Sequence, residues 1–484
     1  MNLDVKSILV NSSYFIKKRR YVIVSFLFLS GITLFILCKG NLFTEDTHIT
    51  RVYEEPETDF FQPSTPTHFP VSEGLKPQVE FWKKIFAEYT SKQAVIHDRR
   101  HVSIIYTVID LNERQVYSES ARKKKIRSVI KKYKRMLRKM KKLRPENFGT
   151  LSGEEKKIFN MIEDVPGNYR FERAKRNIRV QYGLKDSFQK ALVNSTPYLK
   201  EMERIFSEKG LPVELTRLPF AESSFNVEAH SLAGAVGIWQ FIRSTGKNYL
   251  RIDGYIDERR DPLKSTEAAA KLLSSYYRQF KSWPLAITAY NHGSYAMKKA
   301  VKKMKSRDLE TIINKYKGRT FGFSSRNYYV EFLAILEILK DYRQYFGEIE
   351  IFTPEKYDEF ILEDYIKMNT LIKYCSLEEE VITRLNPELT KSVLRSRRFL
   401  PKHYPLKVPA GMKEKLENEY AMIASTEKKS HIKITKLHRV KFGQSLSYIA
   451  MIYKTPMKAI VKANSIENPN MLNKGQVLKI PTQI

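Results

Sequence analysis

One carboxyl group in the sequence has unusually apolar neighbours. Glu222 directly follows Leu218-Pro219-Phe220-Ala221, and residues 218–226 contain no Lys or Arg. Poor hydration disfavours the charged form of a carboxyl group, so the pKa of Glu222 should rise. A carboxyl group that stays protonated near neutral pH can donate its proton to a leaving oxygen. A Glu beside apolar residues on a helix is more often a solvent-facing residue, so this signal alone does not define a site.

Three short motifs in one order give Glu222 its context. They are Glu-Ser at 222–223, Gly-Ile-Trp-Gln at 237–240 and Ala-Tyr-Asn at 289–291. This combination resembles the lytic murein transglycosylases, whose catalytic domain is related to goose-type lysozyme. Arg-Arg-Asp-Pro at 259–262 and the sequence STEAAAKLL at 265–273 look most like the membrane-bound transglycosylase D branch. The resemblance covers roughly residues 213–345.

The resemblance implies that Glu222 is the single catalytic acid and base. Hydrolytic glycosidases usually need two carboxyl groups beside the scissile bond, and no second acid here lies in a comparably apolar stretch. Asp253, Asp257, Asp261 and Glu267 have polar or basic neighbours and are interpreted as surface charges or helix caps. In the family, the C6 hydroxyl of N-acetylmuramic acid replaces the second carboxyl group and attacks C1. The implied product is a 1,6-anhydromuramoyl end, formed without water, metal or organic cofactor.

The resemblance also implies five substrate-binding residues, three of which have a structural alternative. A turn serine would explain Ser231, a helix end would explain Asn291, and a core aromatic would explain Tyr290. The carboxamide of Gln240 suits sugar hydroxyls or an acetamido group. The last of the five is Tyr328, with the adjacent Tyr329 as the alternative register.

Other residues near these motifs are interpreted structurally or as modifiers. Gly237 fits a close backbone approach or a positive φ, and Trp239 and Trp283 are expected to be buried aromatics rather than sugar platforms. The chain departs from the family after Asn291, where His292 and Tyr295 replace small residues. These two side chains are expected to narrow the cleft without touching the proton chemistry.

The carboxy-terminal residues 436–482 predict a strand, two helices and a second strand. This order resembles a LysM domain, which in its family binds glycan containing N-acetylglucosamine. The residues carried over as glycan contacts are Gly443, Ser445, Asn464 and Ile466. Residues 349–411 resemble a degenerate copy of this module, with an ordinary α/β connector as the alternative.

The amino-terminal part predicts a membrane anchor. Residues 21–38 form an uncharged apolar run long enough to cross a bilayer as a helix, and four cations at 17–20 precede it. The positive-inside rule then places residues 1–20 in the cytoplasm and the rest of the chain on the periplasmic or extracytoplasmic side. A cleaved signal peptide is the alternative, but no small residues close the run. Residues 39–72, rich in Pro and acidic residues, are interpreted as a tether.

Residues 73–200 are predicted to be a mostly helical scaffold. Within them, residues 122–144 place apolar side chains at helical spacing, with cations over the remaining surface. Such a helix could lie on anionic lipid or nucleic acid. We favour the alternative, in which the apolar stripe packs on neighbouring helices while the lysines face water.

The composition and net charge of the whole chain limit these interpretations. The 484 residues have 42% hydrophobic content and a formal net charge of +32, which excludes a fully disordered chain and favours polyanionic partners. Two cysteines exclude a disulfide framework and a Cys-rich metal site.

The sequence therefore predicts a mainly α protein. Its parts are one transmembrane helix, a lysozyme-like catalytic domain at 201–346 and a LysM module. The expected function is peptidoglycan cleavage by a transglycosylase, and the expected partners are glycan strands and the membrane, not nucleic acid. A hydrolytic muramidase, a non-catalytic wall-binding scaffold and, from charge alone, a nucleic-acid-binding protein are the alternatives.

Overall fold

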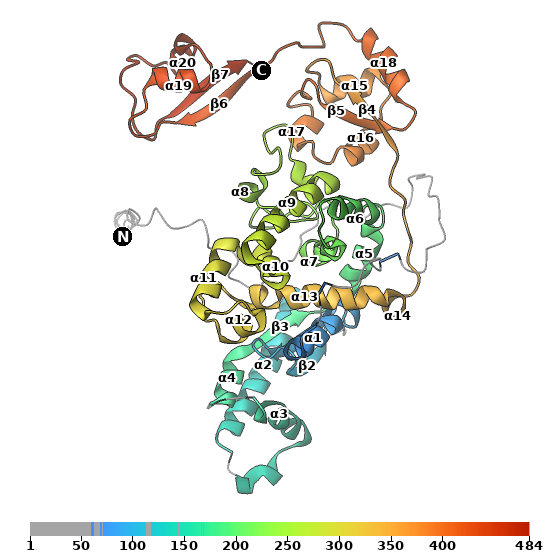
Figure 1. The fold of residues 1–484 in the computed structure, drawn as a ribbon, viewed down its shortest axis with the longest axis vertical. Helices are drawn as coiled ribbons and strands as arrows, with labels where there is room; N and C mark the ends of the chain where they lie inside the picture. The colour runs from blue at the N-terminus through green and yellow to red at the C-terminus, as the bar shows by residue number, and fades with distance from the viewer. Residues whose placement is uncertain are drawn as a thin grey trace, which may run out of the picture. The chain divides into compact units, whose positions relative to one another are not determined.

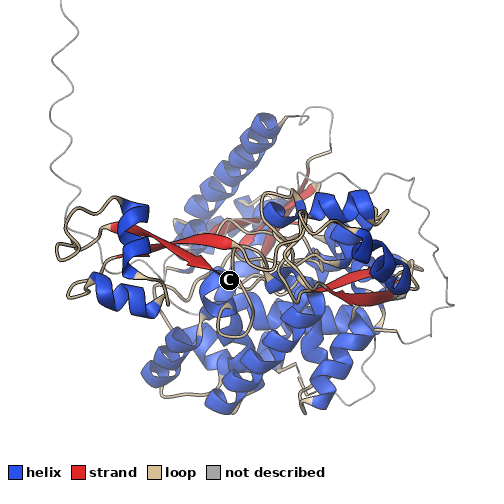
Figure 2. Ribbon diagram, turned by 90° about the horizontal axis from the view of Figure 1, so that it is seen from above, coloured by secondary structure: helices blue, strands red, loops and turns tan. Residues whose placement is uncertain are grey.

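The computed structural model describes residues 60–61, 68–69, 71–112, 118–143, 145–165, 167 and 169–483. The expected cytoplasmic segment 1–20, the apolar run 21–38 and most of the tether 39–72 lie outside these residues. Among the residues that are described, no helix has the length and apolarity needed to span a bilayer. The described chain is mainly helical, as predicted, and its strands form small separate sheets (Figure 2).

The chain divides into two compact units. Unit 1 holds the described residues up to Leu250 together with Arg259–Pro354, and unit 2 holds Arg251–Glu258 together with the described residues from Glu355 onward.

Unit 1 begins with a helical and sheet-containing part (Figure 1). Its helices are η1 (Glu73–Leu75), α1 (Lys76–Ala87), α2 (Glu119–Lys141), η3 (Pro145–Thr150), α3 (Gly153–Glu163) and α4 (Arg170–Asn177). Its strands are β1 (Gln93–Asp98), β2 (Ile105–Asp110) and β3 (Ile178–Tyr182).

The rest of unit 1 is helical. Its elements are α5 (Lys185–Ser195), α6 (Leu199–Glu208), η4 (Val213–Arg217), α7 (Leu218–Glu222), α8 (Arg243–Gly246), α9 (Pro262–Phe280), α10 (Trp283–His292), α11 (Ser294–Met304), α12 (Leu309–Lys315), α13 (Phe323–Lys340) and α14 (Tyr342–Phe346). A further short helix, η5 (Glu258–Arg260), lies where the chain returns from unit 2 to unit 1.

The three-stranded sheet is an element that the prediction of a mostly helical scaffold at residues 73–200 did not include. Its strands are antiparallel in the order β2-β1-β3, with Val95 opposite Val108 and Ile96 opposite Val180. Almost all of β1 is buried, so it lacks the alternation of apolar and polar residues that marks a half-exposed strand. A short run of this kind cannot be distinguished from a buried helix by periodicity alone.

The basic helix predicted at 122–144 is present as α2. Ser118 caps it by accepting a hydrogen bond from the Ala121 backbone N–H. Its apolar stripe packs into a core shared with the sheet and with α3 and α4. The prediction that the stripe packs inward while the cations face solvent is therefore confirmed.

Helix α13 is the central element of the second half of unit 1. It packs against α1, α7 and α10, and most of its side chains are buried. The Trp82 indole N–H of α1 donates to Oδ1 of Asn327 over 2.9 Å within this core. A helix packed on several sides is a rigid support for any functional side chain that it carries.

Two aromatic residues from the expected tether are part of the unit 1 core. Phe61 is 1% exposed, its carbonyl oxygen accepts from the buried Arg217 guanidinium over 2.9 Å, and its ring meets Phe220 edge-on. Phe69 is also buried, with its ring edge-on to Phe332. These residues dock because two aromatic side chains remove a large apolar area from water.

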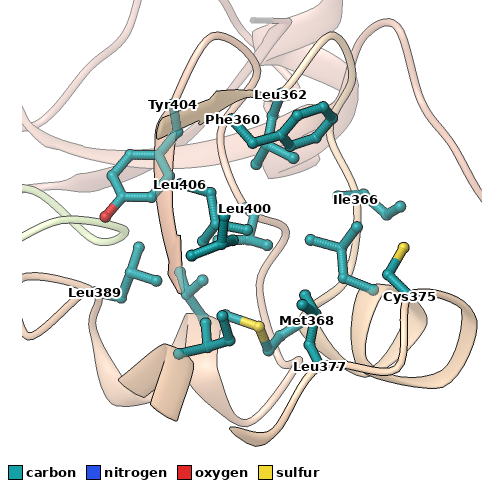
Figure 3. Close-up of a cluster of buried hydrophobic side chains, with 14 of the residues drawn as sticks. Phe360, Leu362, Ile366, Met368, Cys375, Leu377, Leu389, Leu400, Tyr404 and Leu406 are labelled. Atoms are coloured by element: carbon teal, nitrogen blue, oxygen red, sulfur yellow. The ribbon is translucent and has the colours of Figure 1, made fainter. Parts of the chain in front are cut away.

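Unit 2 contains two small modules, each built around one pair of antiparallel strands. The first comprises β4 (Tyr357–Ile361), α15 (Met368–Tyr374), α16 (Glu379–Leu385), α17 (Lys391–Leu394) and β5 (Pro405–Pro409), followed by α18 (Lys413–Met422). Its buried core includes the free thiol of Cys375 (Figure 3). The second module comprises β6 (Lys433–Arg439), α19 (Leu446–Ile452), α20 (Met457–Asn464) and β7 (Val477–Gln483).

The two strand pairs of unit 2 repeat one design. Their helix pairs start at Met368 and Leu446, 78 positions apart, and Asn386 and Asn464 end those pairs with the same separation. The strand pairing is also equivalent in the two copies. Glu359 pairs with Lys407 in the first copy, and Leu437 pairs with Lys479 in the second.

The same residue type also fastens each copy. The Asn386 carboxamide donates to the carbonyl oxygen of Lys407 and accepts from its N–H. The Asn464 carboxamide makes the same two bonds with Lys479. Residues 357–409 therefore share with the carboxy-terminal module a pair of strands that enclose two helices, with the short helix α17 added before β5.

Candidate active site

Glu222 is the last residue of α7, a short helix opened by Pro219 in its first turn. The helix stops because Ser224 and Phe225 both adopt a left-handed backbone with φ of 53°. Ser223 then ties this end to the Gly-Ile-Trp-Gln loop, because its hydroxyl donates to the carbonyl oxygen of Ile238 over 2.9 Å. The first two sequence motifs are thereby joined in space.

The carboxyl group of Glu222 is half-buried and accepts one hydrogen bond. The Tyr328 hydroxyl of α13 donates to its Oε1 atom. Burial raises the pKa of Glu222 to about 7, and the hydrogen bond from Tyr328 opposes that rise. A carboxyl group with this pKa is protonated in about half of the molecules at pH 7, so it can donate a proton and also accept one.

Tyr290 supports the site through the backbone rather than through the carboxyl group. Its hydroxyl donates to the carbonyl oxygen of Trp239 over 2.8 Å. Burial, and next the charge of Glu222, raise the pKa of Tyr290, so the two side chains are electrostatic neighbours. Tyr290 therefore fixes the loop that follows Gly237.

The Gly-Ile-Trp-Gln loop needs an unusual backbone. Gly237 has a φ of 76°, and a Cβ atom there would collide with the carbonyl oxygen of Arg259. Gln240 also lies in the left-handed region, with φ of 49°, and its Nε2 donates to the carbonyl oxygen of Gly237. Its Oε1 accepts no hydrogen bond from the residues that the structure describes, so it remains available as an acceptor.

Two of the expected substrate-binding residues make structural hydrogen bonds. The Ser231 hydroxyl accepts from the Ala235 backbone N–H over 3.0 Å, which closes a turn. Asn291 accepts from the Ser325 hydroxyl over 3.2 Å, and the adjacent His292 lies 3.1 Å from the same hydroxyl. Neither Ser231 nor Asn291 is hydrogen-bonded to Glu222 among the described residues.

The prediction of buried tryptophans holds for Trp239 but not for Trp283. Trp239 is fully buried, stacks on Phe206, and its indole N–H donates to the Thr266 hydroxyl over 2.8 Å. Trp283 is half-buried and stacks on Tyr277 with ring centroids 4.2 Å apart. Trp239 is thus a core residue of the loop that it belongs to.

The sequence reasoning missed a second carboxyl group beside Glu222. Glu331 follows Tyr328 by three residues on α13, which places both side chains on one face of the helix. Burial, and next the charge of Glu222, raise the pKa of Glu331 to about 8, while Arg179 opposes the rise. The three-residue spacing from Tyr328, in an otherwise apolar stretch, is the signal that could have identified Glu331.

No group of three or more His, Cys, Asp or Glu side chains within the described ranges could hold a metal ion. The acid–base groups that the structure describes at this site are the two carboxyl groups and their tyrosine neighbours.

The expected glycan contacts of the carboxy-terminal module are mostly framework residues. Gly443 has a positive φ, Ser445 caps α19, Asn464 holds β7, and Ile466 packs on the core. Phe442 and Met471, in the loops after β6 and after α20, are 88% and 73% exposed. These two apolar side chains are surface candidates that the sequence reasoning did not select.

Comparisons with known proteins identify what two parts of the chain are similar to. The family profile "Transglycosylase SLT domain" matches residues 205–313, and the profile "LysM domain" matches residues 438–481. The chain is 33% identical over 184 residues to the membrane-bound lytic murein transglycosylase D of Escherichia coli strains K12 and O6:H1. These matches cover 37% of this chain and 39% of each relative, so the chain spans about two fifths of their length.

Two solved structures are also similar in sequence over part of the chain. The lytic transglycosylase Slt of Pseudomonas aeruginosa is 21% identical with a TM-score of 0.24, and the 70 kDa soluble lytic transglycosylase of Escherichia coli is 22% identical with a TM-score of 0.26. Each match covers 31% of this chain and 25% of the solved chain. The two profile matches place a transglycosylase SLT domain at residues 205–313 and a LysM domain at residues 438–481, and over 184 residues the chain is similar to the membrane-bound lytic murein transglycosylase D of Escherichia coli.

Proposed function

We propose that this protein is a peptidoglycan lytic transglycosylase. It cleaves the bond between N-acetylmuramic acid and N-acetylglucosamine and leaves 1,6-anhydromuramic acid ends. The observation that carries the proposal is the half-buried Glu222, whose pKa burial raises to about 7 and whose carboxyl group accepts a hydrogen bond from Tyr328. The two family matches and the similarity to murein transglycosylases support the choice of substrate.

Glu222 acts twice in the proposed reaction. The protonated carboxyl group first gives its proton to the oxygen that links C1 of muramic acid to the next glucosamine, and the C1–O bond breaks. The resulting carboxylate then takes the proton of the C6 hydroxyl as that oxygen bonds to C1. Glu222 ends the cycle protonated, no water is consumed, and a pKa near 7 serves both steps.

The neighbouring residues have separate roles in this proposal. Tyr328 orients the carboxyl group, while Tyr290 holds the loop that presents Gln240. The Oε1 atom of Gln240 accepts from a substrate hydroxyl or acetamido group. Ser231 and Asn291 contact the glycan while also closing the turn and the helix junction that they occupy.

The hydrolytic alternative needs a second carboxyl group in its ionised form, either as nucleophile or as base for water. Glu331 is the acid that the electrostatics couple to Glu222, but its pKa of about 8 keeps it mostly protonated at pH 7. A protonated carboxyl group cannot activate water. This favours the transglycosylase over the muramidase.

The remaining modules target the reaction in our proposal. The LysM domain, with Gly443, Ser445, Asn464 and Ile466, holds the protein on glycan, and the repeated fold supports a second, LysM-like copy within residues 349–411. Residues 21–38 anchor the chain in the membrane, with residues 1–20 in the cytoplasm and residues 39–72 beginning on the periplasmic side. Domains tethered in this way meet glycan at a raised local concentration.

The test is mass spectrometry of the muropeptides that the full-length protein releases from isolated sacculi. Wild type should release anhydro ends, and Glu222→Gln should release none while still binding sacculi. The matched control is Glu228→Gln, which changes an exposed Glu six residues away and should leave release unchanged. Products heavier by one water would identify a muramidase, and absence of release by wild type would favour the scaffold.

A further inference from the structure

The solvent face of α2 carries a line of cations that the proposed reaction does not use. The helix buries Ile126, Tyr133, Leu137 and Met140 in the core that it shares with the three-stranded sheet, α3 and α4. At about 100° per residue, the opposite face carries six cations. We call them the α2 cation stripe: Lys124, Arg127, Lys131, Arg135, Arg138 and, at the C-cap, Lys142.

The six stripe cations differ from other lysines of α2 in how their charge is balanced. Four lysines outside the stripe have acidic partners: Lys123 pairs with Glu119, Lys132 with Glu154, Lys139 with Glu155 and Lys141 with Glu172. No stripe residue forms an ion pair with another described residue. The positive charge of the stripe is therefore left for an external partner.

The dimensions and composition of the stripe select the class of partner. From Lys124 to Lys142 a helix rises about 27 Å, so the charges follow a nearly straight line. Tyr133, the aromatic residue of α2, is buried on the other side, so the stripe offers no ring for stacking on sugars or bases. The apolar side of α2 is also buried, which leaves electrostatic contact with a surface as the means of binding.

We propose that the α2 cation stripe docks on the headgroups of an anionic lipid bilayer. This step rests on the proposed anchor at residues 21–38. Residues 39–59 can extend over at most about 75 Å, so the anchor keeps unit 1 within reach of the bilayer surface. Cations near an anionic leaflet are attracted within about one Debye length, roughly 10 Å at 0.1 M salt.

The test uses the full-length chain reconstituted in phosphatidylcholine nanodiscs with or without phosphatidylglycerol. A fluorophore is attached at Ser128→Cys, beside the stripe, in a Cys38→Ser background. Cys375 should not label, because it is buried and burial raises the pKa of its thiol to about 11. A headgroup-attached quencher should quench the fluorophore when phosphatidylglycerol is present, and added salt should reverse the quenching.

Two variants that each lose four positive charges test whether the stripe is responsible for docking. Converting four stripe cations to Gln should lower the ratio of docked to undocked protein at least about tenfold: Lys124→Gln, Lys131→Gln, Arg135→Gln and Arg138→Gln. The control removes four exposed lysines of α9 and α11 and should dock like wild type: Lys271→Gln, Lys298→Gln, Lys302→Gln and Lys303→Gln.

Three outcomes would overturn the proposal. Quenching without phosphatidylglycerol, equal loss in both variants, or a stripe variant that loses sacculus binding but keeps lipid contact would each do so. Release of anhydro muropeptides is measured in parallel. It should be unchanged in the stripe variant, so a failure of docking is distinguished from a failure of the proposed enzyme function.

Discussion

The Tyr328 hydroxyl lies 2.5 Å from Oε1 of Glu222 and donates a hydrogen bond to it. This contact joins the end of α7 to the middle of α13, two elements more than one hundred residues apart in sequence. It stabilises the carboxylate form, while the surrounding burial stabilises the protonated form. The balance between the two leaves the pKa of Glu222 near neutral pH.

Replacing Tyr328 by Phe should shift that balance toward the protonated form. Without the hydroxyl, the pKa of Glu222 should rise above about 7, because the interaction that lowers it is lost. The alkaline limb of the pH–rate profile for muropeptide release should move to higher pH, and the maximal rate should fall about ten- to a hundredfold. Tyr329→Phe is the matched control, and an equal shift in that variant would place the supporting tyrosine at the wrong position.

Much of the site was predictable because its determinants are local in sequence. The apolar stretch before Glu222 indicates a poorly hydrated carboxyl group, and the helical spacing of residues 122–144 predicts α2. The choice between Tyr328 and Tyr329 was not local. It depends on how α13 is rotated about its axis toward α7, which is a property of tertiary packing.

Other features escaped prediction for the same reason. Tyr290 was expected to reach the carboxyl group or the substrate, but its hydroxyl binds a backbone carbonyl of the Gly-Ile-Trp-Gln loop. Glu331 acquires its raised pKa from residues distant in sequence. The Lys479 bonds of Asn464 are likewise invisible in sequence, because strand β7 follows that residue by more than ten positions.

Replacing Glu222 by Gln should make unit 1 more stable above pH 7. In the unfolded chain the carboxyl group ionises near 4.5, but in the folded protein its pKa is about 7. Between these values the unfolded state loses a proton that the folded state retains, so wild type loses stability as pH rises. The variant lacks this loss and should gain about 1–3 kcal/mol at pH 8, with little gain at pH 4.

Denaturant unfolding followed by tryptophan fluorescence measures this difference. All three tryptophans of the chain, at positions 82, 239 and 283, lie in unit 1, so the signal reports that unit. A stability difference that stays constant between pH 4 and pH 8 would show that Glu222 ionises as freely in the folded protein as in water.

Replacing Glu331 by Gln should move the alkaline limb of the pH–activity profile to lower pH. In wild type the two carboxyl groups titrate as a pair, because ionising one hinders ionising the other. Above pH 7 this coupling keeps more of the Glu222 population protonated. In the variant Glu222 titrates alone, so activity should decline at lower pH than in wild type. Superimposable profiles would mean that Glu331 has no electrostatic influence on the reaction.

Replacing Phe61 by Ala should destabilise unit 1 by about 3–5 kcal/mol, since a fully buried aromatic ring is removed from the core. Its ring contacts Phe220, two residues before Glu222. The control Phe60→Ala removes a half-buried ring that contacts Lys200 and should cost less. Equal costs, read from tryptophan fluorescence, would mean that residues 60–61 do not dock as the structure describes.

Asn386 and Asn464 are equivalent residues of unit 2 that differ in burial, so replacing each by Ala should destabilise its module to a different extent. Asn386 is fully buried and Asn464 half-buried, although both carboxamides bind the same backbone groups of a closing strand. Asn386→Ala should therefore cost its module about 2–4 kcal/mol, and Asn464→Ala about 1–3 kcal/mol. Hydrogen exchange at the Lys407 and Lys479 amides reports each module separately, and exposed Asn470→Ala should change neither. The glycan affinity of Asn464→Ala should fall only as far as the module unfolds, whereas a loss of binding with normal amide protection would make Asn464 a direct glycan contact.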